Sequence, residues 1–378
     1  MAIKATIRLG EIMSRFLIAM GAAVLALAGP AAAQTQLETR VDGLEHPWSL
    51  AFLPDGRMLV TEKPGRLRIV GPEGLDDAPV GGVPDVLYSG QGGLLVVALH
   101  PEFETNRWIY LTWSEGTPRD NTLHLGRGRL EDGVLLDFRS LFEAQPRRRT
   151  DVHYGGRIAF LPDNSLLLGI GDGFDFREQA QDPASHFGTF VHLDEDGAPQ
   201  GSGFEGAAPG VYTIGHRNPQ AVVRDPATGI VYAHEHGPQG GDEINVLREG
   251  ENYGWPIASH GIDYTGALVT PFETYPGMAD PVHVWVPSIA PAGMAVYRGD
   301  MFPDWDGDLL VAALIPGDAD VPSGHVRRVD LEDGAVAGET VLFGELEARI
   351  RDVRVGPDGA IWLLTDEENG RLVRASRD

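Results

Sequence analysis

The sequence predicts an all-β protein with few helices, folded as a six-bladed β-propeller. Glycine and proline (49 and 27 of 378 residues) are spread along the chain, which is typical of many short strands joined by turns. No stretch keeps an apolar period of 3.6 residues, so helices should be few. Six segments share one form: an apolar strand, a turn containing Pro, Asp or Gly, and a second apolar strand. A unit repeated in this way indicates a ring of similar sheets.

The six predicted hairpins follow one another at fairly regular intervals. They run over residues 48–61, 92–113, 157–170, 221–235, 293–314 and 353–366. The intervals leave room for four short strands and their loops in each unit. Pro-Asp-Gly at 54–56 and at 357–359 suits a hairpin turn, because Asp and Gly tolerate positive φ. A pair of β-sandwiches is the alternative fold, but it would not explain six similar hairpins.

The N-terminal segment is typical of a secretory signal peptide. Arg15 precedes an apolar run over 16–27, and Ala31 to Ala33 form a small-residue cleavage site. We expect residues 1–33 to be removed on export to the periplasm and residues 34–378 to form a single propeller domain. Met13 offers a second start, which would make 1–12 an N-terminal extension. A buried first helix is the alternative, and the apolar run is too short for a comfortable membrane span.

Composition excludes several kinds of site. The absence of cysteine excludes disulfides, thiolate metal sites, iron–sulfur clusters and a cysteine nucleophile. With 55 acidic and 30 basic residues the formal charge is −25, which disfavours nucleic acid and anionic membrane surfaces as partners. Once the signal peptide is removed, Lys63 would be the only lysine.

Polar clusters flank the predicted hairpins. They are Gln91 before the second hairpin, His153 before and Asp172 after the third, His216 to Asn218 before the fourth, Glu235 to Glu243 after it, and Arg349 to Asp352 before the sixth. Chemistry in a propeller belongs to loops at one end of the channel, because the strands are committed to packing. Each cluster also has a plain structural interpretation: an ordinary Gly-rich turn, a structural histidine or a solvated arginine stripe. Their recurrence at equivalent blade positions favours one shared site.

Several longer motifs carry a resemblance to a known family. They are "HPWSLAFLPDGRMLVTEKPGRLRIV", "GQGGLLVVALHPEF", "HYGGRIAFLPD", "GIGDG", "YTIGHRNPQ", "HEHGPQGGDEIN", "NYGWP", "PSIAPAG" and "RIRDVRVGPDG". In this order they resemble the soluble glucose/sorbosone dehydrogenases, periplasmic aldose sugar dehydrogenases that use pyrroloquinoline quinone (PQQ) and calcium. The resemblance covers nearly the whole mature chain and independently implies a six-bladed propeller.

The resemblance implies the following catalytic roles. His153 would be the general base for the anomeric hydroxyl, and Asp172 would orient and polarise its imidazole. Arg217 would stabilise negative charge on the quinone oxygen. Asn218 and Gln91 would hydrogen-bond the carbonyl edge of the cofactor.

Calcium is implied at two places. The main-chain carbonyls of Gly237 and Pro238 would ligate the cofactor-bound Ca²⁺, which suits a hard cation. Asp242, Glu243 and the carbonyl of Tyr253 look like a second, structural calcium site.

The resemblance also implies how PQQ is held, and one position departs from it. Arg349 and Arg351 would pair with the PQQ carboxylates through their planar guanidinium groups. Relatives have a cofactor-contacting lysine where this chain has Ile315 followed by Pro316. We therefore expect weaker PQQ binding, unless Arg298 or another nearby arginine replaces the missing charge.

The resemblance implies oxidation of aldose sugars at C1 to lactones, with hydride transfer to the quinone. The sugar, the electron acceptor and a possible homodimer stay open. A calcium-dependent lactonase is one alternative, although it needs calcium held by acidic or amide side chains where this chain offers Arg and His. A cofactor-free, calcium-binding propeller that binds a sugar or an envelope partner is the other alternative.

Overall fold

The structure is a computed structural model that describes residues 35–332 and 334–377. The predicted signal peptide (1–33), the extension over 1–12 and the cleavage site at Ala33 lie outside the described residues. The part of the chain that is described forms one compact unit. Within it, no helix has the length and apolar character needed to cross a membrane.

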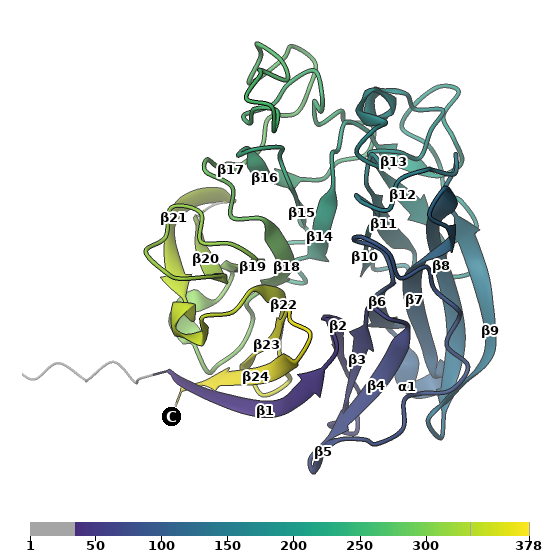
Figure 1. The fold of residues 1–378 in the computed structure, drawn as a ribbon, viewed down its shortest axis with the longest axis vertical. Helices are drawn as coiled ribbons and strands as arrows, with labels where there is room; N and C mark the ends of the chain where they lie inside the picture. The colour runs from purple at the N-terminus through teal and green to yellow at the C-terminus, as the bar shows by residue number, and fades with distance from the viewer. Residues whose placement is uncertain (1–34, 333, 378) are drawn as a thin grey trace, which may run out of the picture. The chain divides into compact units, whose positions relative to one another are not determined.

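Six four-stranded antiparallel sheets build this unit (Figure 1). The first holds β2 (Pro47–Phe52), β3 (Met58–Glu62), β4 (Arg66–Gly71) and β5 (Gly74–Leu75). The second holds β6 (Leu94–Leu99), β7 (Trp108–Thr117), β8 (Asp120–Glu131) and β9 (Val134–Glu143). The third holds β10 (Gly155–Phe160), β11 (Leu166–Ile170), β12 (Thr189–Leu193) and β13 (Val211–Thr213).

The remaining sheets repeat the same order. The fourth holds β14 (Pro219–Arg224), β15 (Val231–Glu235), β16 (Asp242–Val246) and β17 (His283–Trp285). The fifth holds β18 (Pro291–Val296), β19 (Leu309–Ala313), β20 (His325–Glu332) and β21 (Ala335–Leu342). The sixth holds β22 (Ile350–Val355), β23 (Ile361–Thr365), β24 (Gly370–Ser376) and, from the other end of the chain, β1 (Gln36–Leu44). The single α-helix of the described residues is α1 (Phe103–Asn106). Short 3-10 helices are formed by Arg177–Gln181, Pro303–Trp305 and Gly344–Leu346.

The predicted propeller with few helices is confirmed. The first strands of the six sheets, β2, β6, β10, β14, β18 and β22, contact one another in a closed ring (Figure 1). Each predicted hairpin corresponds to the two innermost strands of one sheet. Five of the six second strands, β3, β11, β15, β19 and β23, are buried along their whole length, while the longer β7 is exposed over its last three residues. The ring of similar sheets excludes the sandwich alternative.

A buried arginine ties several innermost strands together inside the ring. Arg157, from β10, forms an ion pair with Asp352 of β22 at 3.0 Å and stacks over the ring of Trp48 at 3.9 Å. Its Nε donates to the carbonyl of Gln220 in β14 at 3.0 Å. Burial lowers the pKa of Arg157 to about 9, with Asp352 acting in the opposite direction. One side chain thus connects strands of four sheets.

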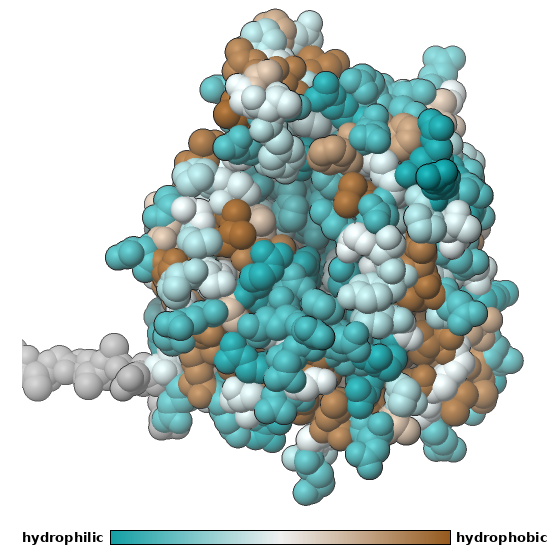
Figure 2. Space-filling model, in the orientation of Figure 1, coloured by the Kyte–Doolittle hydropathy of each residue, from teal (hydrophilic) through white to brown (hydrophobic). Residues whose placement is uncertain are grey.

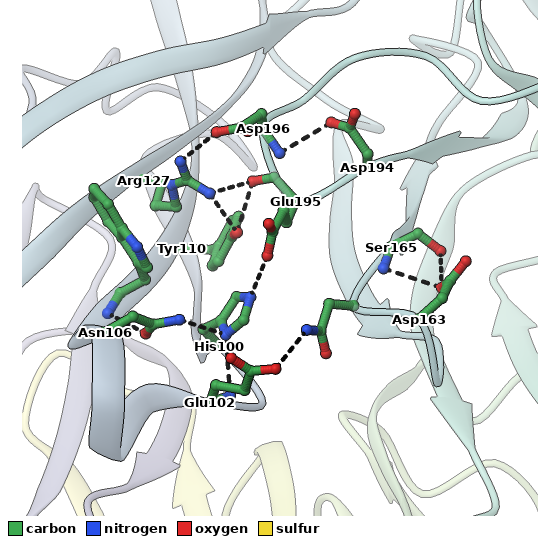
Figure 3. A network of polar contacts seen from close by, with 12 residues as sticks. His100, Glu102, Asn106, Tyr110, Arg127, Asp163, Ser165, Asp194, Glu195 and Asp196 are labelled. Atoms are coloured by element: carbon green, nitrogen blue, oxygen red, sulfur yellow. Dashed lines mark hydrogen bonds and ion pairs between the residues drawn. The ribbon is translucent and has the colours of Figure 1, made fainter.

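A second polar network joins the second and third sheets at the far ends of their innermost strands (Figure 3). The Nδ1 of His100 accepts from Asn106 at 2.8 Å, so its Nε2 carries the proton that faces Glu195 at 2.9 Å. Arg127 and the Tyr110 hydroxyl both donate to the Glu195 carbonyl, at 2.6 and 2.7 Å. This network holds neighbouring blades together at the end away from the clusters described next.

Candidate active site

The predicted site residues gather at one end of the ring. Gln91, His153, Asn218 and Arg349 each lie within three residues of the start of an innermost strand, and Asp172 follows a second strand. Because innermost strands run parallel to one another around a propeller and second strands run back, these positions share one end of the channel. Figure 2 shows one face of the ring, where hydrophilic residues predominate around a central hollow.

His153 and Asp172 form a buried pair. The Nδ1 of His153 lies 2.7 Å from Oδ1 of Asp172, and the side chains are 6 % and 1 % exposed. Asp172 also accepts from the indole nitrogen of Trp255 at 2.8 Å and from the amide of Phe174 at 2.7 Å. Nδ1 therefore carries a proton, which leaves a lone pair on Nε2. Within the described residues Nε2 has no hydrogen-bond partner.

The backbone at His153 is held in an uncommon conformation. Its φ is 54°, in the left-handed region that costs a non-glycine residue energy and recurs at functional sites. Its amide donates to Oε1 of Gln91 at 2.8 Å, and its carbonyl accepts from Arg148 at 2.7 Å. A Cβ at Gly171 would lie 2.2 Å from that carbonyl, so only glycine fits there. The surrounding residues thus fix the position of the imidazole.

The electrostatics favour a neutral His153 paired with an ionised Asp172. Burial lowers the pKa of His153, and the hydrogen bond that His153 donates to Asp172 acts in the opposite direction without reversing the shift. For Asp172, burial acts to raise the pKa, but the His153 hydrogen bond and nearby charges outweigh it and the net shift is downward. At neutral pH the imidazole is therefore uncharged and can accept a proton.

Arg217 and Asn218 precede β14 and lie beside this pair. The guanidinium of Arg217 donates to the carbonyls of Gly237 and His236 at 2.5 and 3.2 Å, and it lies 5.3 Å from the ring of Trp255. The Oδ1 of Asn218 accepts from Gln220 at 3.0 Å. Its Nδ2 is buried without a partner among the described residues, so it is an unused donor.

A cavity of about 320 Å³ opens beside these residues. Its lining includes Trp48, Gln91, Arg349 and Arg351, so the structure brings three of the predicted cofactor-binding residues together with an aromatic ring. Gln91 uses its carbonyl on His153, which leaves its amide NH₂ as a donor toward the cavity. Both arginines pair with Asp366, at 3.2 and 2.6 Å. The Nε of Arg351 is buried and has no partner within the described chain.

A second cavity of about 300 Å³ is lined in part by residues that contact the His153–Asp172 pair. Phe174, Trp255, Tyr264 and Arg217 line it. The ring of Phe174 contacts the His153 imidazole edge-on at 5.2 Å and stacks on Tyr264 at 6.3 Å. Aromatic rings and polar side chains in one cleft suit a small polar ligand that also presents C–H groups.

The predicted cofactor-calcium ligands lie in the loop after β15. Gly237 and Pro238 line a cavity next to Tyr264 and Ile315. The Gly237 carbonyl accepts from Arg217, so a cation at this oxygen would lie beside a guanidinium. Both carboxylate oxygens of Asp242 are engaged: one accepts from the Gly237 amide at 2.9 Å. The other accepts from Ser288 at 2.6 Å and from two backbone amides at 2.9 Å. Asp242 therefore orders this loop.

Glu243 and Tyr253, predicted for a structural calcium site, lie behind the loop. Burial raises the pKa of Glu243, and the neighbouring acids Glu235 and Asp242 act in the same direction. Such an accumulation of carboxylates is suited to a cation. The Tyr253 ring stacks on His216 at 4.7 Å, and its hydroxyl donates to Val246. No group of three or more His, Asp or Glu side chains in the described ranges is arranged to hold a metal ion.

Three residues of the site were missed by sequence reasoning: Lys63, Asp366 and Trp255. Lys63 and Asp366 follow the second strands β3 and β23 just as Asp172 follows β11, so their equivalent blade position could have identified them. Trp255 lies in a long loop, where the sequence gives no such signal. Arg298 is wrong as a replacement cation, because it pairs with Asp225 and Asp306 at 2.8 and 2.6 Å.

Arg298 follows the far end of β18 and lines a cavity with Phe52, Phe160 and Arg354. It therefore lies at the opposite end of the innermost strands from Arg349. Ile315 is 36 % exposed and lines the cavity of Gly237 and Pro238. Its neighbour Leu314 lines the cavity of Arg349 and Arg351.

Comparison with known proteins identifies the relatives of this chain. Residues 44–374 match the sequence model described as Glucose / Sorbosone dehydrogenase. Aldose sugar dehydrogenase YliI of Escherichia coli is 40% identical over 357 residues, covering 92% of this chain and 94% of that protein. A solved glucose dehydrogenase is 40% identical with a TM-score of 0.86, covering 91% of this chain and 100% of its own.

A more distant solved structure was obtained with a ligand. The PQQ-bound form of an aldose sugar dehydrogenase from Streptomyces coelicolor is 27% identical with a TM-score of 0.73, and it covers 91% of this chain and 99% of its own. The match to the family extends over nearly all of the described residues. The chain is thus an oxidoreductase of the glucose/sorbosone dehydrogenase family.

Proposed function

We propose that this protein oxidises aldose sugars at C1 to lactones, with PQQ as the hydride acceptor, after export to the periplasm. The observation that carries the proposal is the buried His153–Asp172 pair. Its Nε2 has no partner within the described residues, and its imidazole contacts Phe174 of the aromatic cleft. The names of the relatives support the substrate class. The PQQ-bound relative supports the cofactor.

The residues of the cavity fit PQQ. The cofactor carries three carboxylates, and burying them requires cations or strong donors. Arg349 and Arg351 supply guanidinium groups, and Nε of Arg351 is a buried donor without a partner among the described residues. Nδ2 of Asn218, a residue outside the lining of this cavity, is a second such donor. The ring of Trp48 supplies an aromatic wall. When bound, PQQ would supply a quinone that accepts a hydride, which carries two electrons and one proton.

The residues of the chain would divide the chemistry between them. The Nε2 of His153 takes the proton of the anomeric hydroxyl while the C1 hydrogen leaves as hydride, so the sugar loses one proton and one hydride. Asp172 holds the imidazole in the tautomer that leaves Nε2 free, and it offsets the positive charge that forms there. Arg217 places positive charge beside the reacting groups. Phe174, Trp255 and Tyr264 position the sugar ring.

Calcium fits less directly. The Gly237 carbonyl and the loop carbonyl of Pro238 are oxygen ligands of the right kind, but the first already accepts from Arg217. We propose that calcium at these carbonyls depends on negative charge brought by the cofactor. The acidic surroundings of Glu243 support a separate structural site with Asp242 and the Tyr253 carbonyl. Prolonged chelator dialysis should abolish activity and lower the melting temperature. Full activity after dialysis would contradict the calcium assignment at Gly237 and Pro238, and an unchanged melting temperature would contradict the structural site.

The lactonase alternative finds no support. It requires calcium held by acidic or amide side chains at the channel centre. The channel is instead occupied by the Arg157–Asp352 ion pair. This leaves the oxidoreductase as the function that the geometry supports best.

Reconstitution tests the proposal. Purified protein is incubated with PQQ and Ca²⁺, and dye reduction is followed with a panel of aldoses, with 1-deoxy sugars as matched controls. We expect reduction with aldoses and none with the 1-deoxy sugars, because these lack the hydroxyl that His153 deprotonates. PQQ binding without any sugar-dependent reduction would contradict the proposed reaction. Absence of PQQ binding would favour the cofactor-free propeller.

A further inference from the structure

The cavity beside the active site holds an excess of positive charge. Lys63, Arg349, Arg351 and Asp366 all line it. Asp366 accepts from both arginines. Burial acts to raise the pKa of Asp366, but these cations outweigh it and lower the pKa to about 2. One carboxylate against three cations leaves two positive charges in a partly enclosed space. Like charges held together in this way indicate an anionic ligand.

Lys63 is the member of this cluster without a carboxylate of its own. Among the described residues no Asp or Glu oxygen lies within ion-pair distance of its Nζ, whose one hydrogen bond goes to the carbonyl of Gly90 at 3.1 Å. Burial lowers the pKa of Lys63, and the charge of Arg351 acts in the same direction. An ammonium group has three donors, so two are left for a ligand.

The backbone holds Lys63 firmly in place. Its amide donates to His46 at 3.2 Å, and its carbonyl accepts from Leu94 of the neighbouring sheet at 3.0 Å. A Cβ at Gly93 would lie 2.2 Å from the same carbonyl, so glycine is required for this approach. Lys63 is also the only lysine of the described residues, beside a large number of arginines. The position is thus built by two blades.

We propose that Lys63 binds a carboxylate group of the cofactor. It does so from the part of the cavity wall that the first sheet forms, where Lys63 has no acidic partner of its own among the described residues. The inference rests on the proposed function, because it takes PQQ as the ligand. Arg349 and Arg351 approach from the sixth sheet and share Asp366, so their charge is partly neutralised. Lys63 supplies the cation that the Ile315 position lacks, from a different blade.

Titration of PQQ against variants tests this inference. Binding is followed by quenching of tryptophan fluorescence, to which Trp48 in the cavity wall contributes. Lys63→Gln should raise the dissociation constant roughly tenfold to a hundredfold, the scale for one charge-assisted contact. Lys63→Arg keeps the charge, so its dissociation constant for PQQ should lie closer to that of the wild type. Arg40→Gln is the matched control, since it removes an equal charge from β1, where Arg40 pairs with Glu38 at 2.9 Å.

The melting temperature without PQQ separates binding from structure. Lys63→Gln relieves repulsion from Arg349 and Arg351, so it should leave this temperature unchanged or slightly higher. A clear fall would show a structural role and overturn the inference. Equal dissociation constants for the wild type and Lys63→Gln would also overturn it, while the proposed function would stand. No PQQ binding by the wild type would overturn the proposed cofactor, and this inference with it.

Discussion

Two histidine–carboxylate pairs occupy equivalent positions in neighbouring blades. His153 pairs with Asp172 at 2.7 Å in the third sheet, and His216 pairs with Glu235 at 2.7 Å in the fourth. In both, the histidine precedes an innermost strand and the acid ends or follows the second strand. In both, Nδ1 faces the carboxylate and the pair is buried.

The pairs differ at the other ring nitrogen. The Nε2 of His216 lies 2.9 Å from the Thr213 hydroxyl, and its ring packs between Phe190 and Tyr253 at 4.9 and 4.7 Å. The Nε2 of His153 has no partner within the described residues. A satisfied imidazole stabilises the fold, whereas a free lone pair is available for chemistry. The same local arrangement therefore serves structure in one blade and, we propose, catalysis in the next.

Removing the imidazole that we propose as the general base should have the largest effect. His153→Ala should lower turnover by roughly 10²–10⁴, the scale for a lost general base, and should leave PQQ binding largely intact. Single-turnover and steady-state rates of reconstituted protein measure it. Turnover equal to that of the wild type would remove His153 from the mechanism.

Removing the satisfied imidazole should affect stability instead. His216→Ala deletes a packed ring and leaves Glu235 with one buried partner fewer, so the free energy of unfolding should fall by about 2–4 kcal/mol. Urea unfolding of His216→Ala and His153→Ala, side by side, measures the difference. A larger loss of stability in His153→Ala would contradict the distinction between the two pairs.

Exchanging the two carboxylates for amides sharpens the comparison. Asp172→Asn weakens the orientation of His153, so turnover should fall, by less than in His153→Ala because the base itself is kept. Glu235→Gln is the control, because its histidine touches no reacting group. A similar loss of turnover in both variants, measured below their melting temperatures, would show that neither carboxylate acts specifically.

The smallest expected effect is on the pH profile. Because the pKa of His153 is lowered, its neutral, proton-accepting form persists below pH 6.5, and the acidic limb of kcat/KM should have its midpoint below that value. Asp172 acts to raise this pKa, so Asp172→Asn should move the midpoint further down. A midpoint above 6.5 in the wild type, or an upward shift in the variant, would be inconsistent with this assignment.

The six repeats of an apolar strand, a turn with Pro, Asp or Gly, and a second apolar strand were sufficient to predict the propeller. Each inner hairpin carries this pattern within one short segment of the sequence. The Asp172 and Arg351 positions could be found for the same reason, as polar residues at equivalent hairpin ends. Lys63 was noticed only as a solitary lysine, since its neighbours Arg349 and Arg351 come from a sheet almost 300 residues away in the sequence. Ring closure, which brings the two together, depends on contacts between sheets that no single segment encodes.

The strand pairing between β1 and β24 sets an order of events in time. Strand β1, the first strand of the described residues, must wait for β24, the last, since the sixth sheet contains both. That sheet also carries Arg351 in β22, so the cationic wall of the cavity is completed only when the ring closes. Under the proposed function, loading of an anionic cofactor would therefore be a late step of maturation, which follows synthesis of both ends of the ring.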